Sequence, residues 1–369
     1  MTIGCPKEIK IHEYRVGLTP SNVAEYVSAG HKVYIESNAG DAIGFPDSEY
    51  AKAGAIITDK ATLFKESDMI IKVKEPIASE YDYFREGQNL YTYLHLAADK
   101  ALTEMLLAKK IFSIAYETIK VRNTLPCLAP MSSIAGRLAV LESAKYTQKH
   151  FGGNGTLLCG VPGVNNGKVL IIGGGVVGIN AAQVAVGIGA SVTILDIDMD
   201  RLAYIDQIFD MKVHTMYSSR GNLLSALAEA DVVIGAVLIP GAKAPKLVKK
   251  EDLKVMKKGS ILTDVAIDQG GCFETSKATS HSDPIYEIDG IIHYCVANMP
   301  GAVARTSTLA LTDSTLRFGL MIANLGAKEA ALKNEVIFEG VNTYNGLCTY
   351  KGVSDAFGIA YTPTQEALK

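Results

Sequence analysis

The sequence predicts an α/β protein with two doubly wound domains, each built on a mainly parallel sheet. Three observations support this prediction. The chain has 369 residues, which is too long for one ordinary hydrophobic core. Short apolar segments alternate with helix-like segments in two separate series along the chain. Two long helical segments, at about 129–150 and 303–324, flank the second series.

The composition is that of a soluble globular protein, with 48% hydrophobic and 20% charged residues. The formal net charge of -3 gives no electrostatic reason to expect a nucleic acid or an anionic membrane as a partner. No run approaches the roughly 18 apolar residues that a membrane span needs, and the N-terminus does not resemble a signal peptide. The six cysteines have no metal-site spacing. We therefore expect reduced thiols in a cytoplasmic protein and no metal site.

The N-terminal third carries the first series of alternating elements. A helix is expected over Ser21–Ala29, where Ser21 can cap the first turn and Gly30 can end the last one. Strands separated by helices in this way indicate a parallel sheet. The expected strands are Lys32–Glu36, Ala55–Thr58, Met69–Val73, Leu90–His95 and Phe112–Tyr116.

The second series follows a long helix predicted over Ala129–His150, with Ser132 as its cap and Gly152-Gly153 as its end. The expected strands of this series are Lys168–Ile172, Ser191–Asp196, Val232–Ala236, Ser260–Asp264 and Ile291–Val296.

Another long helix is predicted from about Val303 to Asn324, and the tail after residue 328 is expected to hold a final helix. Because two long helices flank the second series, that series has the pattern of an inserted domain. We predict that residues 129–305 form it, and that residues 1–128 and 306–369 form the other domain together.

The strongest local signal is KVLIIGGGVVGINAAQVAVGIGASVTILD, residues 168–196. Gly173, Gly175 and Gly178 fit G-x-G-x-x-G directly after an apolar strand and at the start of a helix. The first glycine permits a tight turn, the second lets the backbone approach a pyrophosphate, and the third lets the helix pack on the sheet. Asp196 ends the next strand, where a carboxylate accepts hydrogen bonds from a ribose and repels a 2′-phosphate. The pattern predicts a Rossmann domain that binds NAD rather than NADP. The alternative, a helix start that binds nothing, is disfavoured by this context.

In the first series, polar side chains stand near the ends of predicted strands, where doubly wound sheets bind ligands. Arg15 follows the first strand, Lys74 follows Met69–Val73, and His95 ends another strand. An arginine and a lysine together can hold a small carboxylate, and a histidine can transfer a proton near neutral pH. Arg15 could instead be a surface cation, and His95 a structural histidine. Their joint placement at strand ends favours a site.

Two aspartates of the second series stand in ILTDVAIDQGG, Asp264 at a strand end and Asp268 in the loop beyond it. We interpret Asp264 as structural. The carboxylate of Asp268 could activate water or steer an ammonium group, or it could only form an Asx-turn in this glycine-rich loop.

Several longer segments extend the pattern. PKEIKIHEYRVGLTP, KVKEP, YTYLHLA, APMSSIAGR, GVPGV, DVAIDQGG and VANMPGAVARTST occur in this order over nearly the whole chain. With the glycine loop, they resemble the alanine dehydrogenase family, to which the N-terminal half of the proton-translocating nicotinamide nucleotide transhydrogenase is similar. The resemblance implies reversible NAD-dependent oxidative deamination of L-alanine to pyruvate and ammonium, with hydride passing from Cα to NAD. It also implies a homohexamer.

The resemblance further implies roles for individual residues. Arg15 and Lys74 would hold the substrate carboxylate, and His95 and Asp268 would be the catalytic proton-transfer residues. The residues expected to support these groups are Glu75, Tyr93 and Glu117. The implied NAD contacts, beside the three glycines, are Ser132, Asp196, Arg201, Ser218, Val237, Leu238, Val265, Ala266, Ile267, Asp268, Val296, Ala297, Asn298 and Met299.

Two other functions remain open from the sequence. A transhydrogenase-type NAD(H)-binding subunit would pass hydride to the NADP of a partner and leave L-alanine untouched. A non-catalytic dinucleotide-binding protein would bind NAD and turn over no amino acid. The joint presence of Arg15, Lys74, His95 and Asp268 counts against the second of these.

Overall fold

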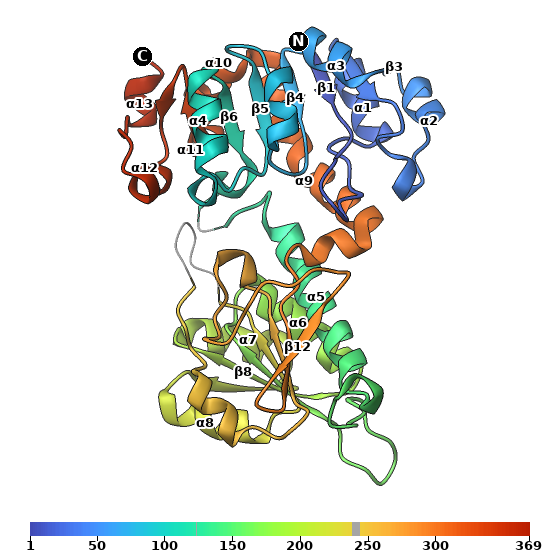
Figure 1. The fold of residues 1–369 in the computed structure, drawn as a ribbon, viewed down its shortest axis with the longest axis vertical. Helices are drawn as coiled ribbons and strands as arrows, with labels where there is room; N and C mark the ends of the chain where they lie inside the picture. The colour runs from blue at the N-terminus through green and yellow to red at the C-terminus, as the bar shows by residue number, and fades with distance from the viewer. Residues whose placement is uncertain (123, 238–243) are drawn as a thin grey trace. The chain divides into compact units, whose positions relative to one another are not determined.

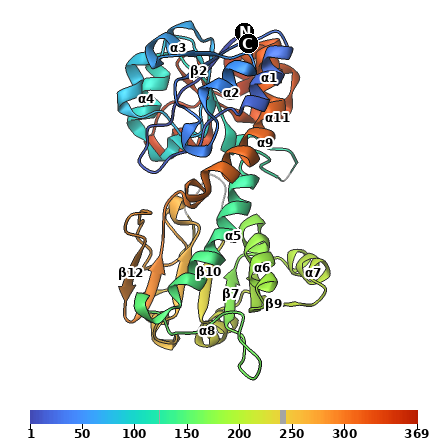
Figure 2. The same cartoon turned by 90° about the vertical axis from the view of Figure 1, so that its right-hand side faces the viewer.

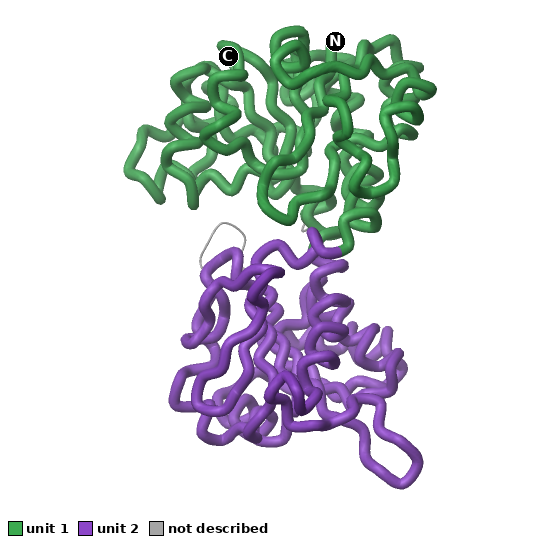
Figure 3. Tube along the Cα trace, turned by 45° about the vertical axis from the view of Figure 1, so that its right-hand side comes forward, with its two compact units in different colours: residues 1–131, 303–369 green, residues 132–302 purple. Residues whose placement is uncertain are grey.

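The computed structural model describes residues 1–122, 124–237 and 244–369. Contacts within the chain divide it into two compact units, which are coloured separately in Figure 3. Unit 1 comprises residues 1–131 and 303–369, and unit 2 comprises residues 132–302. The predicted α/β class with two mainly parallel sheets is confirmed.

Unit 1 is built around an eight-stranded sheet with the order β15-β14-β6-β5-β4-β1-β2-β3 (Figure 1). Strands β1 to β6 pair in parallel, whereas β14 pairs antiparallel with both β6 and β15. The strand order reverses between the neighbours β1 and β4, which makes their carboxyl ends a topological switch point. The strands are β1 (Thr2–Cys5), β2 (Lys32–Glu36), β3 (Ile56–Thr58), β4 (Met69–Ile71), β5 (Asn89–Thr92), β6 (Phe112–Ala115), β14 (Val341–Tyr344) and β15 (Leu347–Cys348).

The first helix of unit 1, α1 (Pro20–Ser28), begins one residue earlier than predicted. Thr19 caps it instead of Ser21: its hydroxyl accepts from the N–H of Asn22, and the Asn22 side chain accepts from the N–H of Thr19. This reciprocal pair and Pro20 in the first turn favour a helix start here. The other helices of unit 1 are α2 (Asp47–Lys52), α3 (Lys60–Glu66), α4 (Lys100–Ala108), α9 (Ala304–Leu325), α10 (Ala327–Lys333), α11 (Glu335–Gly340), α12 (Lys351–Phe357) and α13 (Thr364–Ala367).

Unit 2 contains a seven-stranded sheet with the order β12-β13-β11-β10-β7-β8-β9, and only β12 is antiparallel to its neighbour. Successive residues of β7 enter two different apolar clusters, Val169 and Ile171 in one and Leu170 and Ile172 in the other. The sheet is therefore buried on both faces, as parallel sheets require. The strands are β7 (Lys168–Ile172), β8 (Ser191–Asp196), β9 (Val213–Tyr217), β10 (Val232–Gly235), β11 (Ile261–Asp264), β12 (Ile285–Ile288) and β13 (Ile291–Tyr294).

A close pair of helices belongs mostly to unit 2: α5 (Ala129–Tyr146), whose first three residues are in unit 1, and α6 (Val176–Gly187). The two helices lie side by side in Figures 1 and 2. A Cβ atom at Gly136 would lie 2.2 Å from the carbonyl oxygen of Val177, so the absence of a side chain allows this approach. Arg137 of α5 donates to Asn180 of α6 at 3.0 Å. The remaining helices are α7 (Met199–Ile208) and α8 (Arg220–Glu229).

Several predicted element ends were wrong. Helix α5 starts at Ala129, so Ser132 lies inside it and does not cap it. The helix ends at Tyr146 because the chain turns back there, and the N–H of Gly155 donates to the carbonyl of Thr147. The tail holds helices α10 to α13 and the strands β14 and β15 where one final helix was expected.

Four strands of unit 1 are also shorter than predicted, β3 and β6 by one residue each and β4 and β5 by two. Strand β4 ends at Ile71, because the N–H groups of Val73 and Lys74 donate to the side chain of Glu8 in place of a neighbouring strand. Strand β5 ends at Thr92, which places His95 in the turn beyond the strand.

Gly178 permits the packing of α6 on the turn after β7. A Cβ atom at this position would lie 1.9 Å from the carbonyl oxygen of Gly173, a distance that no real contact allows. Gly187, the last residue of the same helix, is exposed, and a Cβ atom there would meet nothing within 4 Å.

We predict opposite effects of alanine at these two positions. Gly178→Ala should lower the free energy of unfolding by about 1–3 kcal/mol, because the new methyl group forces the helix away from the turn. Gly187→Ala should raise it by about 0.5–1 kcal/mol, because alanine has the higher helix propensity. Chemical denaturation of the two variants checks this. Equal stability of both variants would contradict the packing role of Gly178.

Candidate active site

Polar residues follow four neighbouring strands of unit 1 at their carboxyl ends. Arg15 comes after β1, Lys74 after β4, His95 after β5, and Glu117 after β6. These strands are adjacent in the order β6-β5-β4-β1, and β1 and β4 form the switch point. Because ligands bind at the carboxyl ends of strands at such a point, this edge of the sheet is the candidate substrate site.

Arg15 is buried, with 2% of its surface exposed, so the interpretation as a surface cation was wrong. Its Nε donates to Glu13 Oε1 at 2.6 Å and its Nη2 to Glu13 Oε2 at 2.5 Å, and its Nη1 lies 3.1 Å from Met131 Sδ. Burial lowers the pKa of Arg15, but the hydrogen bonds and charge of Glu13 outweigh burial and raise it overall. The two-pronged contact fixes the plane of the guanidinium.

Lys74 is half-buried, and hydrogen bonds hold both its backbone N–H and its backbone carbonyl. Its N–H donates to Glu8 Oε1 at 3.2 Å, and its carbonyl accepts from the hydroxyl of Thr92 at 3.1 Å. Within the described residues, the ammonium of Lys74 takes part in no ion pair. The neighbouring carboxylate, Glu75, pairs instead with Lys10. A lysine with a fixed backbone and an uncommitted charge is suited to bind an anion.

Glu75 lies near the other charged groups of this edge. Burial raises its pKa, but the charges of Lys74, Lys10 and His95 outweigh burial and lower the pKa below its ordinary range. Its Oε2 atom is buried and accepts no hydrogen bond from the described residues. Glu75 is therefore an ionised carboxylate with an acceptor that a ligand or a water molecule can use.

His95 has a left-handed backbone, with φ of 47° and ψ of 37°. Glu117 supports this conformation: its Oε1 accepts from the N–H of His95 at 2.7 Å, and both of its oxygens accept from the N–H of Leu94 at 3.2 Å. The imidazole lies parallel to the ring of Tyr93, with centroids 5.9 Å apart, and its Nδ1 is 4.0 Å from Glu117. The His95 side chain is 45% exposed. A strained residue with an accessible ring is typical of a functional histidine.

Tyr93 forms the buried surface on which His95 lies. Its hydroxyl donates to the carbonyl of Cys127 at 2.6 Å, and its ring meets Tyr116 edge to face at 5.1 Å. Burial raises the pKa of Tyr93 well above its ordinary value. Tyr93 is therefore neutral at physiological pH and acts here as a packing surface.

The candidate cofactor site of unit 2 is the turn between β7 and α6. Gly173 has φ of 105°, which favours glycine, and Gly175 forms the N-terminal cap of α6. A Cβ atom at Gly175 would meet nothing within 4 Å, so the space beside this backbone is open. Open space at the free N–H groups of a helix N-terminus fits a pyrophosphate. The residues present therefore fit a dinucleotide.

Asp196 holds the glycine turn. Its Oδ2 accepts from the N–H of Gly174 at 2.6 Å, and its Oδ1 accepts from the N–H of Asp198 at 3.0 Å. A Cβ atom at Gly174 would lie 3.1 Å from Arg201, and the N–H of Ser218 donates to the carbonyl of Asp196 at 2.9 Å. Asp196, Arg201 and Ser218 are thus gathered beside the glycine turn, where the adenosine ribose of a dinucleotide would bind.

The other predicted cofactor residues follow strands at the same edge of the sheet. Val237 lies beside Gly173 after β10, whereas Leu238 lies outside the described residues. Ser132 differs, because it belongs to helix α5. Those that follow β11 and β13 are Val265, Ala266, Ile267, Val296, Ala297, Asn298 and Met299.

The two aspartates after β11 have different environments. Asp264 is fully buried and accepts from the N–H groups of Ala266 and Cys272 at 3.0 and 2.9 Å, which closes the loop. Asp268 is exposed and is not part of an Asx-turn, because the N–H of Gly270 donates to the carbonyl of Ile267. Its carboxylate accepts no hydrogen bond from the described residues, so Asp268 is the aspartate available to a ligand.

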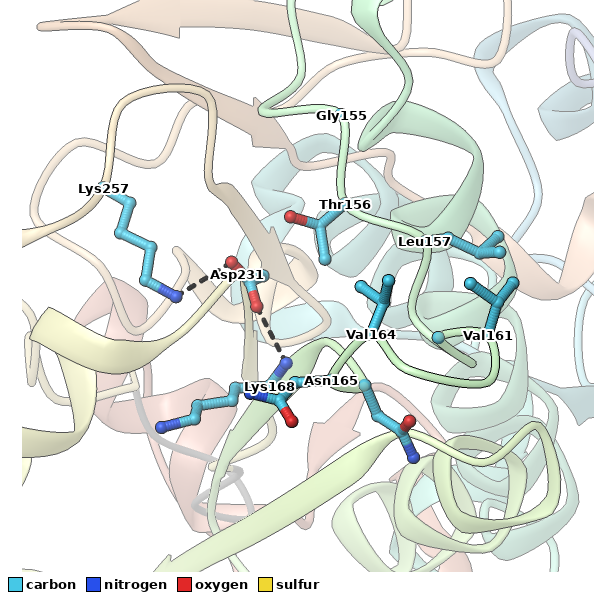
Figure 4. A pocket seen from close by; sticks show the side chains of 11 residues that line it. Gly155, Thr156, Leu157, Val161, Val164, Asn165, Lys168, Asp231 and Lys257 are labelled. Atoms are coloured by element: carbon cyan, nitrogen blue, oxygen red, sulfur yellow. Dashed lines mark hydrogen bonds and ion pairs between the residues drawn. The ribbon is translucent and has the colours of Figure 1, made fainter.

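A pocket of about 510 Å³ lies at the opposite edge of the unit 2 sheet (Figure 4). Lys168 and Asp231, which stand at the amino ends of β7 and β10, line it. Lys257 pairs with Asp231 at 3.0 Å, and Lys168 pairs with Glu229 at 2.6 Å. The pocket therefore has no uncommitted charge among its described residues and lies at the edge where doubly wound sheets do not bind ligands.

The described residues offer neither a cluster of metal ligands nor a helix that could span a membrane. They contain no group of three or more His, Cys, Asp or Glu side chains arranged to hold a metal ion. None of their helices combines the length and the apolar character needed to cross a membrane.

The buried charges behind the candidate substrate site were not predicted from the sequence. These are Glu8, Glu13, Lys72 and Glu80, each at most 6% exposed. One signal was present, since Lys72 stands in the apolar segment MIIKV, and a buried lysine needs carboxylate partners. Nothing in the sequence identified which carboxylates these would be.

Comparisons with known proteins agree with this geometry. The family model "Alanine dehydrogenase/PNT, N-terminal domain" matches residues 4–135, and "Alanine dehydrogenase/PNT, C-terminal domain" matches residues 139–351. The chain is 54% identical to an alanine dehydrogenase of Methanococcus maripaludis and 52% identical to alanine dehydrogenase 2 of Staphylococcus aureus. Each of these matches covers all of both chains.

Solved structures give the same result. An L-alanine dehydrogenase is 48% identical with a TM-score of 0.93, and the match covers 97% of this chain and 99% of that one. A transhydrogenase from Sinorhizobium meliloti is 25% identical with a TM-score of 0.81, and the match covers 95% and 99% of the two chains. The chain belongs to the alanine dehydrogenase/PNT family.

Proposed function

We propose that this protein catalyses the reversible NAD-dependent oxidative deamination of L-alanine to pyruvate and ammonium. The observation that carries the proposal is the placement of Arg15, Lys74 and His95 at the carboxyl ends of β1, β4 and β5, at the switch point of unit 1. The full-length identity to alanine dehydrogenases supports the choice of substrate. Arg15 and Lys74 can bind the carboxylate of L-alanine. His95 and Asp268 can deprotonate its amine.

Lys74 and Arg15 hold the substrate carboxylate in this proposal. Glu13 neutralises Arg15 and fixes its orientation, so Arg15 contributes a directed, planar group. Lys74 forms no ion pair among the described residues, although its charge acts on the nearby Glu75, and it supplies the second positive charge. Together they orient the substrate Cα, which is how a bound substrate gains a favourable reaction geometry.

His95 and Asp268 transfer the protons in this proposal. The His95 ring is accessible and is kept in place by Tyr93 and Glu117. The Asp268 carboxylate is exposed in unit 2. Bound NAD would supply the acceptor for the Cα hydride, and water would convert the resulting imine to pyruvate and ammonium. The chain holds the carboxylate, removes protons from the amine and the attacking water, and protonates the departing nitrogen.

NAD is the proposed cofactor, and Gly173, Gly175 and Gly178 are the proposed pyrophosphate-binding glycines. Asp196 is the residue that favours NAD over NADP, because a 2′-phosphate would meet its negative charge. The other proposed NAD contacts are Ser132, Arg201, Ser218, Val237, Leu238, Val265, Ala266, Ile267, Asp268, Val296, Ala297, Asn298 and Met299. The homohexamer and the cytoplasmic location expected from the sequence remain predictions.

The hydride-passing subunit is the less supported alternative. The transhydrogenase structure shares 25% identity with this chain, against 48% for the L-alanine dehydrogenase structure. A transhydrogenase subunit has no use for a carboxylate-binding pair at the switch point of unit 1.

We predict that the purified protein reduces NAD when L-alanine is added at alkaline pH. The rise in absorbance of reduced nicotinamide measures the reaction. L-Lactate and L-glutamate are the controls for substrate, and NADP is the control for cofactor; all three should give little or no signal. Binding of NAD without turnover of L-alanine would contradict the proposed function and favour the hydride-passing subunit.

We also predict that His95→Asn strongly lowers the turnover rate without destabilising the fold. Asparagine tolerates the left-handed backbone of His95 but cannot transfer a proton, so kcat should fall by about 10²-fold or more. His95→Ala is the matched variant, which should lose the same activity and also about 1 kcal/mol of stability. Steady-state kinetics and thermal unfolding separate the two effects. Wild-type kcat in His95→Asn would show that His95 is not the proton-transfer residue.

A further inference from the structure

Three buried charges lie directly behind the turn that carries Lys74. Lys72 is fully buried, and its ammonium lies 2.8 Å from Glu80 Oε1 and 3.3 Å from Glu8 Oε2. Glu8 is 6% exposed and Glu80 is 1% exposed. Burial of such groups is costly, and it raises the pKa of Glu8 although the charge of Lys72 opposes this shift. The proposed chemistry gives none of the three a direct role. We name this group the Glu8–Lys72–Glu80 triad.

The triad is bonded to the backbone of the Lys74 turn. Glu8 Oε1 accepts from two successive N–H groups, that of Val73 at 2.7 Å and that of Lys74 at 3.2 Å. Glu80 Oε2 accepts from the N–H of Ile77 at 3.1 Å. The two carboxylates therefore hold the turn at its start and at its end, and Lys72 links them.

Two further contacts place the turn relative to its neighbours in unit 1. The Lys74 carbonyl accepts from the hydroxyl of Thr92, which is fully buried at the end of β5. A Cβ atom at Gly17 would lie 2.8 Å from the carbonyl oxygen of Ile71, so the segment that follows Arg15 packs directly against the end of β4. The backbone of Lys74 is thus fixed by buried groups on both sides, while its ammonium makes no ion pair with the described residues.

From this geometry we propose that Glu8 is a positioning residue for substrate binding, which fixes the Lys74 ammonium by holding the N–H groups of Val73 and Lys74. The inference rests on the proposed function, because it takes Lys74 as a ligand of the substrate carboxylate. Glu8 acts as an acceptor and does not touch the substrate. Lys72, which also pairs with Glu80, holds Glu8 in the orientation that this contact requires.

The structure supplies variants that separate these roles. Glu8→Gln keeps an oxygen that can accept from the two N–H groups, whereas Glu8→Met removes the acceptor and keeps a similar length. In Glu8→Met, Lys72 retains its ion pair with Glu80, so no buried charge is left unpaired. Gln88→Met is the matched control, because Gln88 is also buried in unit 1 and bonds to backbone, but at the amino end of β5.

The test is steady-state kinetics of the full-length enzyme with L-alanine and with NAD. We expect Glu8→Met to raise KM for L-alanine by about tenfold or more and to leave KM for NAD within about twofold, since only substrate contacts are displaced. Glu8→Gln should restore KM to within about threefold of wild type. Gln88→Met should lower the melting temperature and leave KM unchanged.

A double-mutant cycle with Lys74→Met decides whether Glu8 acts through Lys74. If it does, Glu8→Met should raise KM for L-alanine in the wild type but have little further effect in Lys74→Met. The inference would be overturned if the effects of Glu8→Met and Lys74→Met on KM were additive. It would also be overturned if KM were unchanged in Glu8→Met, or if Glu8→Gln were as impaired as Glu8→Met. A wild-type enzyme that does not oxidise L-alanine would overturn the proposed function and this inference with it. If the wild-type enzyme oxidises L-alanine and Glu8→Met has the same KM, this inference alone is overturned.

Discussion

The arrangement of unit 1 depends on the need to pair every charge buried behind its sheet edge. Arg15 is held by Glu13, and Lys72 is held by Glu8 and Glu80, all within the protein interior. Such pairs rarely add stability over apolar packing, so their value lies in the orientations they impose. Here the paired carboxylates also bind backbone N–H groups of the turn that carries Lys74. Two cationic side chains are thereby placed at one edge of one sheet before any substrate arrives.

In unit 2, hydrogen bonds from the backbone to two aspartates fix the loops at the carboxyl edge of the sheet. Its glycine turn is closed by Asp196 and leaves open space beside Gly175 at the start of α6. The loop after β11 is closed by the buried carboxylate of Asp264, and the exposed Asp268 stands on that loop. In both units the parallel sheet brings groups that are distant in sequence to one edge. The chemistry we propose draws on that edge in each unit.

The sequence predicted the α/β class and several strands to the residue, such as Lys168–Ile172 and Ser191–Asp196, because buried parallel strands are short apolar runs with clear limits. It overestimated β4 and β5, whose ends depend on side-chain contacts from distant segments. It missed β14, which pairs antiparallel with β6 across more than 200 residues of sequence. Candidate site residues followed from residue type and position after strands. Their partners Glu8 and Glu13 could not be predicted, because only the folded chain brings these carboxylates to buried cations.

The function we propose requires that hydride passes from the Cα of L-alanine to NAD on this protein. The most direct measurement uses L-alanine that carries deuterium at Cα and follows the label by mass spectrometry. We expect the deuterium to appear in the reduced nicotinamide and to be absent from solvent water. Reduced nicotinamide without deuterium, or pyruvate formed with release of the label to water, would contradict this expectation.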